Sequence, residues 1–158
     1  MTEENNQQQQ QQFDIQRLYL KDLSFEVPDA PQVFLQDEEP NVSLDIDVNN
    51  QQVEDQLYEV ELHLTVSATT TEQKSIFLVE VKYAGIFALS GFEGETLNGM
   101  LGSFCPSIIF PYAREVISDV VTKGSFPQLV LSPINFDALY QQRQQAAEES
   151  AQQGDKKH

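Results

Sequence analysis

The segment LNGMLGSFCPSIIFPYAREVISDVVTK, from Leu97 to Lys123, is the one around which the rest of the chain is organised. Apolar pairs recur in it every four residues, a spacing that predicts a helix. The pairs are Met100/Leu101, Phe104/Cys105, Ile108/Ile109, Tyr112/Ala113, Val116/Ile117 and Val120/Val121. Because an α-helix has 3.6 residues per turn, such a stripe drifts by about 40° per step around the axis. We therefore expect this helix to face more than one neighbour.

Two prolines interrupt the helical pattern. Pro106 and Pro111 each remove a backbone donor and crowd the preceding turn, so the sequence predicts a kink or break near Phe110. Lys123 followed by Gly124 is typical of a helix C-terminus.

Outside this helix, four segments alternate apolar and polar residues, which predicts strands. They span residues 13–27, 42–48, 58–66 and 75–87. In the first, apolar residues fall on odd positions, and a bend is expected where Arg17 and Lys21 interrupt that face. The second and third have one apolar and one polar face, as in an antiparallel sheet with one wet side, and NNQQVED is predicted to form the turn between them.

Three connections complete the predicted domain. DAPQVFLQDEEP, bracketed by prolines, is expected to be extended and to border a groove. Five of the seven glycines lie between Gly85 and Gly102, interleaved with apolar residues, which predicts a mobile flap. A short helix is expected to begin near Asn135 as its cap, with Asp137 in its first turn.

Length and composition indicate one domain with polar tails. A chain of 158 residues can bury about two-thirds of its extended surface. Residues 1–12 form a glutamine-rich tail that we expect to be disordered, and residues 144–158 are expected to be a flexible polar tail. The N-terminal residues lack the features of a signal peptide and no apolar run could span a bilayer, so a cytoplasmic location and no membrane insertion are expected.

The charge balance restricts the class of partner. Twenty-five acidic residues against nine Lys and Arg give a formal charge of −16, which disfavours nucleic acid and anionic membranes. Basic or unfolded polypeptide fits better, although a merely solvated acidic surface has the same composition. Leu78 beside Glu80 on the mostly polar face indicates an exposed patch, either an oligomer contact or a docking site, or else a patch that a loop of the same chain covers.

No residue set points to catalysis, to a bound metal or to a cofactor. His63 is predicted on a wet strand face and His158 is terminal. The acidic pairs Asp45/Asp47 and Glu59/Glu61 follow from strand alternation alone. The glycine-rich stretch lacks the GK[ST] ending of a phosphate-binding loop, and the single cysteine, Cys105, excludes a disulfide framework and is expected in the core. The residues alone indicate a binding protein. An ordinary homo-oligomer would have the same features.

The chain also resembles the SecB protein-export chaperones over nearly its whole folded length. The matching blocks are IQRLYLKDLSFEVPDAP, LYEVELHLTV, FLVEV, GIFALSGFEG and the run from Leu101 to Tyr140. CPSIIFPYARE, GSFPQL and PINFDAL within that run are highly specific. The resemblance implies an α+β fold over residues 13–143, in which a four-stranded antiparallel sheet is backed by a long kinked helix and a short C-terminal helix. It further implies a homotetramer that pairs dimers through their long helices.

The function that the resemblance implies is that of a non-enzymatic, ATP-independent chaperone. SecB proteins bind unfolded precursor proteins in the cytoplasm, keep them competent for translocation and deliver them to the SecA motor. SecA's C-terminal tail is small, basic and zinc-bearing in the family, and the zinc belongs to SecA. An alternative is a SecB-like chaperone dedicated to one partner, such as a toxin–antitoxin pair.

The resemblance also implies two sets of site residues. Those matching the family's SecA-docking positions are Asp22, Glu26, Leu78 and Glu80. Those expected to line the client groove are Val33, Phe34, Val42, Leu44, Ile46 and Tyr112. Where some relatives have a tryptophan this chain has Glu38, so we expect that part of the groove to bind aromatic clients more weakly.

Overall fold

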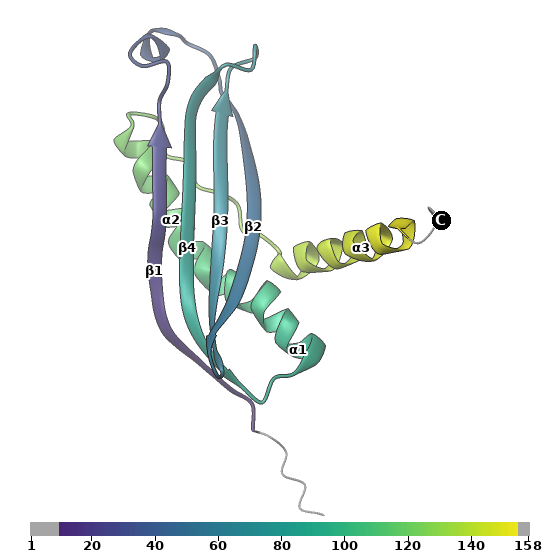
Figure 1. Cartoon of the computed structure of the whole chain (residues 1–158). Coiled ribbons are helices and arrows are strands. Elements are labelled where there is room, and N and C mark those ends of the chain that lie inside the picture. The colour runs from purple at the N-terminus through teal and green to yellow at the C-terminus, as the bar shows by residue number, and fades with distance from the viewer. Residues whose placement is uncertain (1–9, 155–158) are drawn as a thin grey trace, which may run out of the picture.

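A four-stranded antiparallel sheet is the centre of the molecule (Figure 1). The structure is a computed structural model and describes residues 10–154. The strands are β1 (Gln12–Glu26), β2 (Asn41–Glu54), β3 (Leu57–Thr69) and β4 (Ser75–Ser90), in the spatial order β1-β4-β3-β2. The predicted strands and the antiparallel sheet are confirmed, and β1 and β2 form its two edges.

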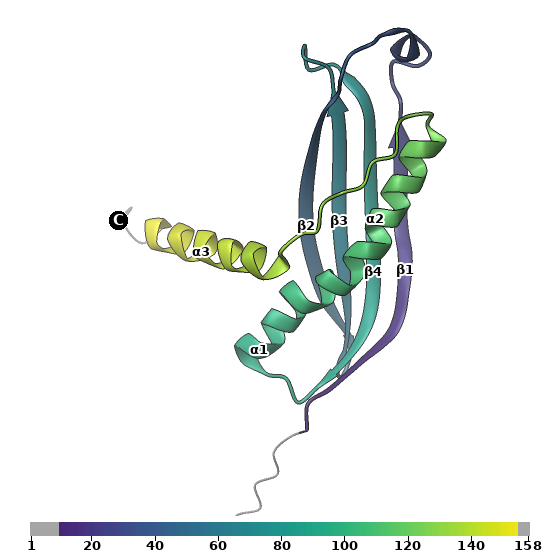
Figure 2. The ribbon, with the colours of Figure 1, turned by 180° about the vertical axis from the view of Figure 1, so that it is seen from behind.

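The helices of the described residues lie on one side of the sheet, which we call the inner face; the opposite side is the outer face. They are α1 (Gly94–Gly99), the π-helical turn η2 (Met100–Phe104), α2 (Cys105–Lys123) and α3 (Phe136–Gly154). Figure 2 shows α2 crossing the inner face diagonally, after which residues 124–135 run back across the sheet to α3. The core lies between α2 and the inner face of β3 and β4, with Leu62, Leu64, Phe87, Ile109 and Ile117 fully buried.

The predicted helix is present, but its irregularity lies earlier than expected. No break occurs at Phe110, since α2 continues through Pro111 to Lys123 and ends at Gly124 as predicted. Burial of the neighbours Ile109 and Phe110, the latter against Phe136 of α3, supports the helix where Pro111 removes a hydrogen bond. The irregular turn is η2, which directly precedes Pro106 and in which Cys105 N–H bonds to the Met100 carbonyl, five residues back.

Strand β1 contains two bulges, at the positions where the predicted face is interrupted. Its register with β4 shifts between Ile15 and Arg17 and again between Leu20 and Asp22. Each extra residue turns the following side chains to the other face. Odd positions therefore face inward only at the two ends of β1, whereas in the middle Leu18 and Leu20 face inward and Tyr19 faces outward, which corrects the single-face prediction.

Two predicted connections are largely regular structure. The segment NNQQVED is not the turn, because β2 extends to Glu54 and only Asp55 and Gln56, the latter with a φ of 62°, connect it to β3. Cross-strand pairing with β3 outweighs the weak strand preference of Asn and Gln. The expected glycine flap is mostly β4, α1 and η2. Gly85 is part of β4, and this position requires glycine because an added Cβ would come within 2.7 Å of the Phe87 ring.

The remaining predictions concern the ends and the proline-rich connection. Asn135 caps α3 by accepting a hydrogen bond from Ala138 N–H at 3.1 Å, as predicted, but the helix continues to Gly154 and is as long as α2, 19 residues each. The connection at 29–40 is not wholly extended, since η1 (Gln32–Leu35) is a 3₁₀ turn that buries Val33. The N-terminal tail prediction falls mainly on residues 1–9, which lie outside the described residues, as do 155–158.

Candidate functional site

The inner face of β2 is a part of the sheet that α2 leaves open. Because α2 packs on β4, β3 and β1, the inward side chains of β2 are only partly covered, and Val42 is 44% exposed. Leu44, Ile46 and Val48 continue the same row and are half-buried. This row and the cavities at its two ends are called the β2 groove below.

The first cavity lies where the connection between β1 and β2 meets residues 126–127. It has a volume of about 260 Å³ and is lined by Val33, Phe34, Gln36, Glu38, Pro40, Thr70, Ile76, Phe126 and Pro127. The Phe126 ring lies 5.5 Å from the Phe34 ring and 4.9 Å from the Phe77 ring, between centroids. Such an apolar, aromatic wall fits a large apolar side chain, and Glu38 is the acidic residue at its rim.

The second cavity, about 290 Å³, lies between β2, η2 and the first turns of α3. Its lining residues are Val48, Asn50, Asn98, Gly102, Leu139, Tyr140 and Arg143. The Tyr140 ring packs so closely on Gly102 that a Cβ there would lie 2.6 Å from it. Ser103 Oγ donates to Asp137, and Arg143 donates to the Ile46 carbonyl and lies 3.3 Å from Asp47 Oδ1, so α3 is anchored against the edge strand.

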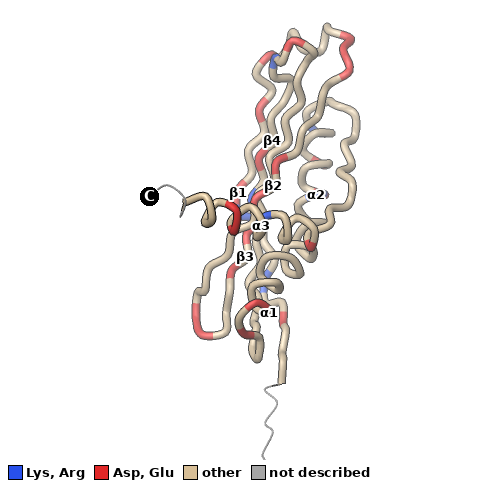
Figure 3. Tube along the Cα trace, turned by 90° about the vertical axis from the view of Figure 1, so that its right-hand side faces the viewer, with Lys and Arg blue, Asp and Glu red and all other residues tan. Residues whose placement is uncertain are grey.

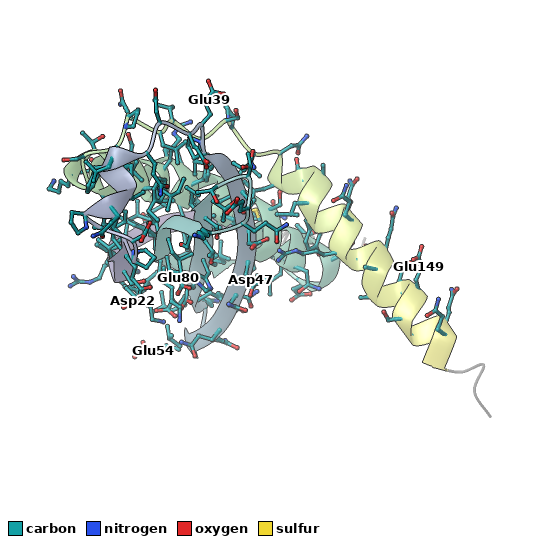
Figure 4. The ribbon with its side chains drawn as sticks, turned by 90° about the horizontal axis from the view of Figure 1, so that it is seen from above. Asp22, Glu39, Asp47, Glu54, Glu80 and Glu149 are labelled. Atoms are coloured by element: carbon teal, nitrogen blue, oxygen red, sulfur yellow. The ribbon has the colours of Figure 1, made fainter. Side chains whose placement is uncertain are left out.

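The outer face brings together the four residues predicted to dock SecA. In the register of β1 with β4, Asp22 lies opposite Lys82, Ser24 opposite Glu80 and Glu26 opposite Leu78. Figure 4 shows Asp22 and Glu80 on the side of the sheet away from α2, and in Figure 3 acidic residues are spread along the strands. Within residues 10–154 no helix covers this face. Leu78 and Glu80 are half-buried among their strand neighbours, and no helix or loop of the described chain crosses this face.

A polar cluster joins three strands on the outer face, next to these residues. Lys21 Nζ lies 2.9 Å from Glu59 Oε1 and 2.9 Å from Glu61 Oε2. Tyr19 OH donates to Glu59, as does Gln51 Nε2 at 3.2 Å. We call these five residues the Lys21 clasp.

The clasp shifts the pKa of its members. Burial and the hydrogen bond to Glu59 raise the pKa of Tyr19 to about 12. Bonds to Glu61 and Glu59 raise the pKa of Lys21, which stays charged at neutral pH. Burial acts to raise the pKa of Glu59, but the bonds from Tyr19, Lys21 and Gln51 outweigh it and hold this pKa below its ordinary value.

A third exposed surface runs along the β1 edge. Ile15, Leu20 and Leu23 face inward from β1 beyond the reach of α2, and Phe104 and Tyr112 project from the helices beside them. Tyr112 stacks on Tyr83, with 5.9 Å between ring centroids, and Phe104 packs edge-on against Phe13. We call these five exposed residues the β1–α2 strip.

Comparisons with known proteins identify the family of this chain. The family model described as preprotein translocase subunit SecB matches residues 6–147. The chain belongs to the SecB family. A protein-export protein SecB of Methylococcus capsulatus is 50% identical over 94% of this chain and 96% of its own. Those of Alcanivorax borkumensis and Nitrosococcus oceani are 54% and 53% identical, over 84% and 85% of this chain and 86% and 82% of theirs.

A solved structure supports the fold of this SecB protein independently of sequence. A SecB-like chaperone of Mycobacterium tuberculosis, in complex with a ChAD peptide from an antitoxin, superposes with a TM-score of 0.64 at 15% identity. The match covers 77% of this chain and 90% of that one. At that identity the likeness shows the fold alone.

The predicted client residues divide between two surfaces of this chain. Val33, Phe34, Val42, Leu44 and Ile46 come together in the β2 groove. Tyr112 does not, because it lies in the β1–α2 strip at the other edge of the sheet. Ile76, Phe126 and Tyr140 also line the cavities but were not predicted, because their place beside β2 depends on how residues 124–135 cross the sheet.

Two further reactive side chains, Cys105 and His63, lie in different parts of the molecule. Cys105 is buried as predicted, and burial raises the pKa of its thiol to about 12. His63 lies on the outer face of β3, but its Nε2 is covered and has no hydrogen-bond partner. Within residues 10–154 no group of three or more His, Cys, Asp or Glu could hold a metal, and no helix is long and apolar enough to cross a membrane.

Proposed function

We propose that this protein is an ATP-independent holdase that binds unfolded precursor proteins in the β2 groove and delivers them to SecA in the cytoplasm. The export-chaperone function follows from membership of the SecB family. The observation that carries the client site is the open apolar row of β2 with a cavity at each end. Catalysis and nucleotide hydrolysis have no part in this mechanism.

The groove offers an unfolded chain two kinds of contact. Val42, Leu44 and Ile46 provide apolar surface, worth roughly 25 cal/mol for each Å² that a client covers. The aromatic cavity at Phe34 and Phe126 accepts a large side chain. An unfolded chain exposes such side chains and a folded one does not, so this chemistry selects unfolded clients.

A refolding assay tests the client site. Added at near-stoichiometric ratio without nucleotide, the protein should delay refolding of a slow-folding, signal-bearing precursor. Leu44→Asp places a charge in the apolar row and should remove most of the delay, whereas Val130→Asp, at an exposed apolar position outside the groove, should not. Normal refolding kinetics at saturating wild-type protein would contradict the proposal.

The outer face is the proposed SecA-docking surface. Its open carboxylates, Asp22, Glu26 and Glu80, complement the basic SecA tail expected in the family, and Leu78 adds an apolar contact between them. Charge reversal at the three acids should weaken SecA binding and leave client binding intact. Because salt screens such contacts, added salt should also weaken docking; salt-insensitive SecA binding would rule out this surface.

The β1–α2 strip is the proposed self-association surface, leading to a homotetramer formed as a dimer of dimers. Its side chains are between 38% and 48% exposed and form one neighbouring group on β1, η2 and α2. A contiguous apolar surface of this kind is characteristic of an interface. This assigns Tyr112 to a subunit contact rather than to the client groove.

The alternative of a dedicated toxin–antitoxin chaperone is less well supported. The relatives that are about half identical are protein-export proteins, whereas the antitoxin-peptide complex is only 15% identical and bears on the fold alone. A pull-down from cytosol separates the two functions: many precursors together with SecA support export, and one abundant partner would support the alternative.

A further inference from the structure

The carboxylates of the outer face differ in how accessible they are. Asp22 and Glu26 are exposed on β1. Glu59 and Glu61 lie on the same face of β3, two strands away, yet their side chains are only 12% and 15% exposed. The acidic face is therefore divided into an open part and a covered part.

Within the Lys21 clasp, Lys21 contacts both Glu59 and Glu61 and covers them, together with Tyr19 and Gln51 at Glu59. Lys21 is the extra residue of the second β1 bulge, so it projects outward beside Asp22 instead of alternating with it. From β1 it reaches over β4, where the small, fully buried Ala84 lies between the strands, to both carboxylates of β3. A longer side chain at position 84 would occupy that path.

The clasp also compensates charge. One ammonium group is shared by two carboxylates at 2.9 Å each, and Tyr19 and Gln51 donate further hydrogen bonds to Glu59. A basic partner approaching this region meets the Lys21 stem and its positive charge before it meets Glu59 or Glu61. Outside the clasp, no such ion pair holds Asp22, Glu26 or Glu80, although Lys82 lies opposite Asp22 in the register of β1 with β4.

We propose that Lys21 sets the boundary of the docking surface for the basic segment of SecA, confining it to Asp22, Glu26, Leu78 and Glu80 by covering Glu59 and Glu61. Lys21 is thus a specificity-determining residue that limits affinity. This inference rests on the proposed docking of SecA to the outer face. It assigns the second bulge in β1 a role in recognition, because the bulge places Lys21 and Asp22 side by side on the outer face.

The test measures SecA binding to full-length Lys21 variants at two salt concentrations. Lys21→Met uncovers two carboxylates and should tighten binding by about three- to tenfold, with a steeper dependence on salt. Lys21→Arg keeps the charge and should bind as the wild type does. The double variant K21M/E61Q has the same net cluster charge as the wild type and should return to wild-type affinity.

Two further variants keep the test decisive. Lys123→Met removes a lysine that pairs only with Asp119 on α2, and should leave SecA binding unchanged. If Lys21→Met does not fold, the double variant E59Q/E61Q provides an alternative test. It removes the two carboxylates that pair with Lys21, so the positive charge of Lys21 beside Asp22 is no longer compensated and binding of the basic segment should weaken.

The outcomes separate this inference from the proposed function. Unchanged affinity in Lys21→Met, with binding abolished by charge reversal at Asp22 and Glu80, overturns the role of Lys21 and keeps the docking surface. Unchanged affinity in both the Lys21 variant and the charge reversal overturns the docking surface itself. Tighter binding in K21M/E61Q equal to that of Lys21→Met would show that uncovered charge is not the cause.

Discussion

Glu38 shows how a single side chain can set the preference of a cavity. It lies at the rim of the aromatic end of the β2 groove, beside Phe34 and close to Phe126. A carboxylate there must lose water when an apolar client side chain covers it, which is unfavourable without a compensating partner. That this position weakens aromatic binding stays a prediction, which the place of Glu38 in the cavity lining makes testable.

Replacing Glu38 by leucine should tighten binding of a peptide rich in aromatic residues. If the peptide covers about 50 Å² more apolar surface, the gain is about 1 kcal/mol, or about fivefold in the dissociation constant. Glu39→Leu is the matched control, because Glu39 lies between the lining residues Glu38 and Pro40 but is not itself part of the lining. Titration calorimetry checks both, and equal gains in the two variants would show that general charge rather than the cavity is responsible.

Tyr19 gives a prediction for alkaline pH. Its pKa is raised to about 12 in the folded chain, from about 10 in the unfolded chain, so its stabilising effect is complete below about pH 10 and is lost as pH rises towards 12. Lys21, whose pKa is also raised, acts in the same direction. Stability should therefore fall more steeply above pH 10 in the wild type than in Tyr19→Phe.

Denaturant unfolding at several pH values between 9 and about 12 measures this difference in slope. A difference absorbance titration of the two proteins isolates the ionisation of Tyr19 itself. A Tyr19 midpoint near its ordinary value of about 10 would contradict the hydrogen bond to Glu59.

At the scale of elements, the attachment of α3 depends on close contacts at its first turns. Tyr140 rests on Gly102 of η2, and Phe136 packs against Phe110 with 5.8 Å between ring centroids. Beyond Arg143 the helix is exposed throughout its described length. The position of α3 over the second cavity is therefore controlled by a few residues.

Gly102→Ala should loosen α3 without unfolding the domain. The new Cβ would lie 2.6 Å from the Tyr140 ring, so Tyr140 must move, and amides of α3 should exchange with solvent faster. Gly99→Ala is the control, because a Cβ there meets nothing within 4 Å and alanine favours the helix by about 1 kcal/mol. In a Tyr140→Ala background the Gly102 effect should vanish; persistence there would place its cause elsewhere.

The elements also show what a sequence can and cannot predict. Period-two and period-four patterns predicted the strands and the long helix because one face of each is buried. The bulges of β1 and the π turn before Pro106 depend on register and packing between distant segments. The sequence showed only that Arg17 and Lys21 interrupt the apolar face of the strand and that prolines interrupt the helical pattern. The β2 residues of the groove were predicted because they follow the strand alternation. Phe126 was not, because it reaches the groove from a distant part of the chain.

At the scale of the whole molecule, the sheet separates three surfaces. The β2 groove lies at one edge of the inner face, the β1–α2 strip at the other edge, and the acidic surface on the outer face. Under the proposed function, a client and SecA would thus contact opposite faces of the same sheet, the client along β2 and SecA along β1 and β4. A chaperone must hold its cargo while it docks, and this arrangement allows both at once.

Subunit contacts should depend on the β1–α2 strip. Tyr112→Glu introduces a charge into an apolar surface and should lower the molecular mass from four chains to two or one at micromolar concentration. Val130→Glu, exposed but outside the strip, should leave the mass unchanged. Light scattering over a dilution series measures this, and an unchanged mass for Tyr112→Glu would place the interface elsewhere.

The two bulges of β1 have a consequence for insertions and deletions. Each adds one residue, and together they restore the original alternation, so the two ends of β1 are in phase and the middle is not. Deleting Lys21 alone would remove the second bulge and leave Asp22 and Glu26 facing outward and Phe25 inward, because the register with β4 already skips Lys21. Deleting Gln16 would remove the first bulge in the same way. A one-residue deletion at either bulge therefore keeps the facing of the remaining side chains, whereas a deletion at a paired position turns the following side chains to the other face.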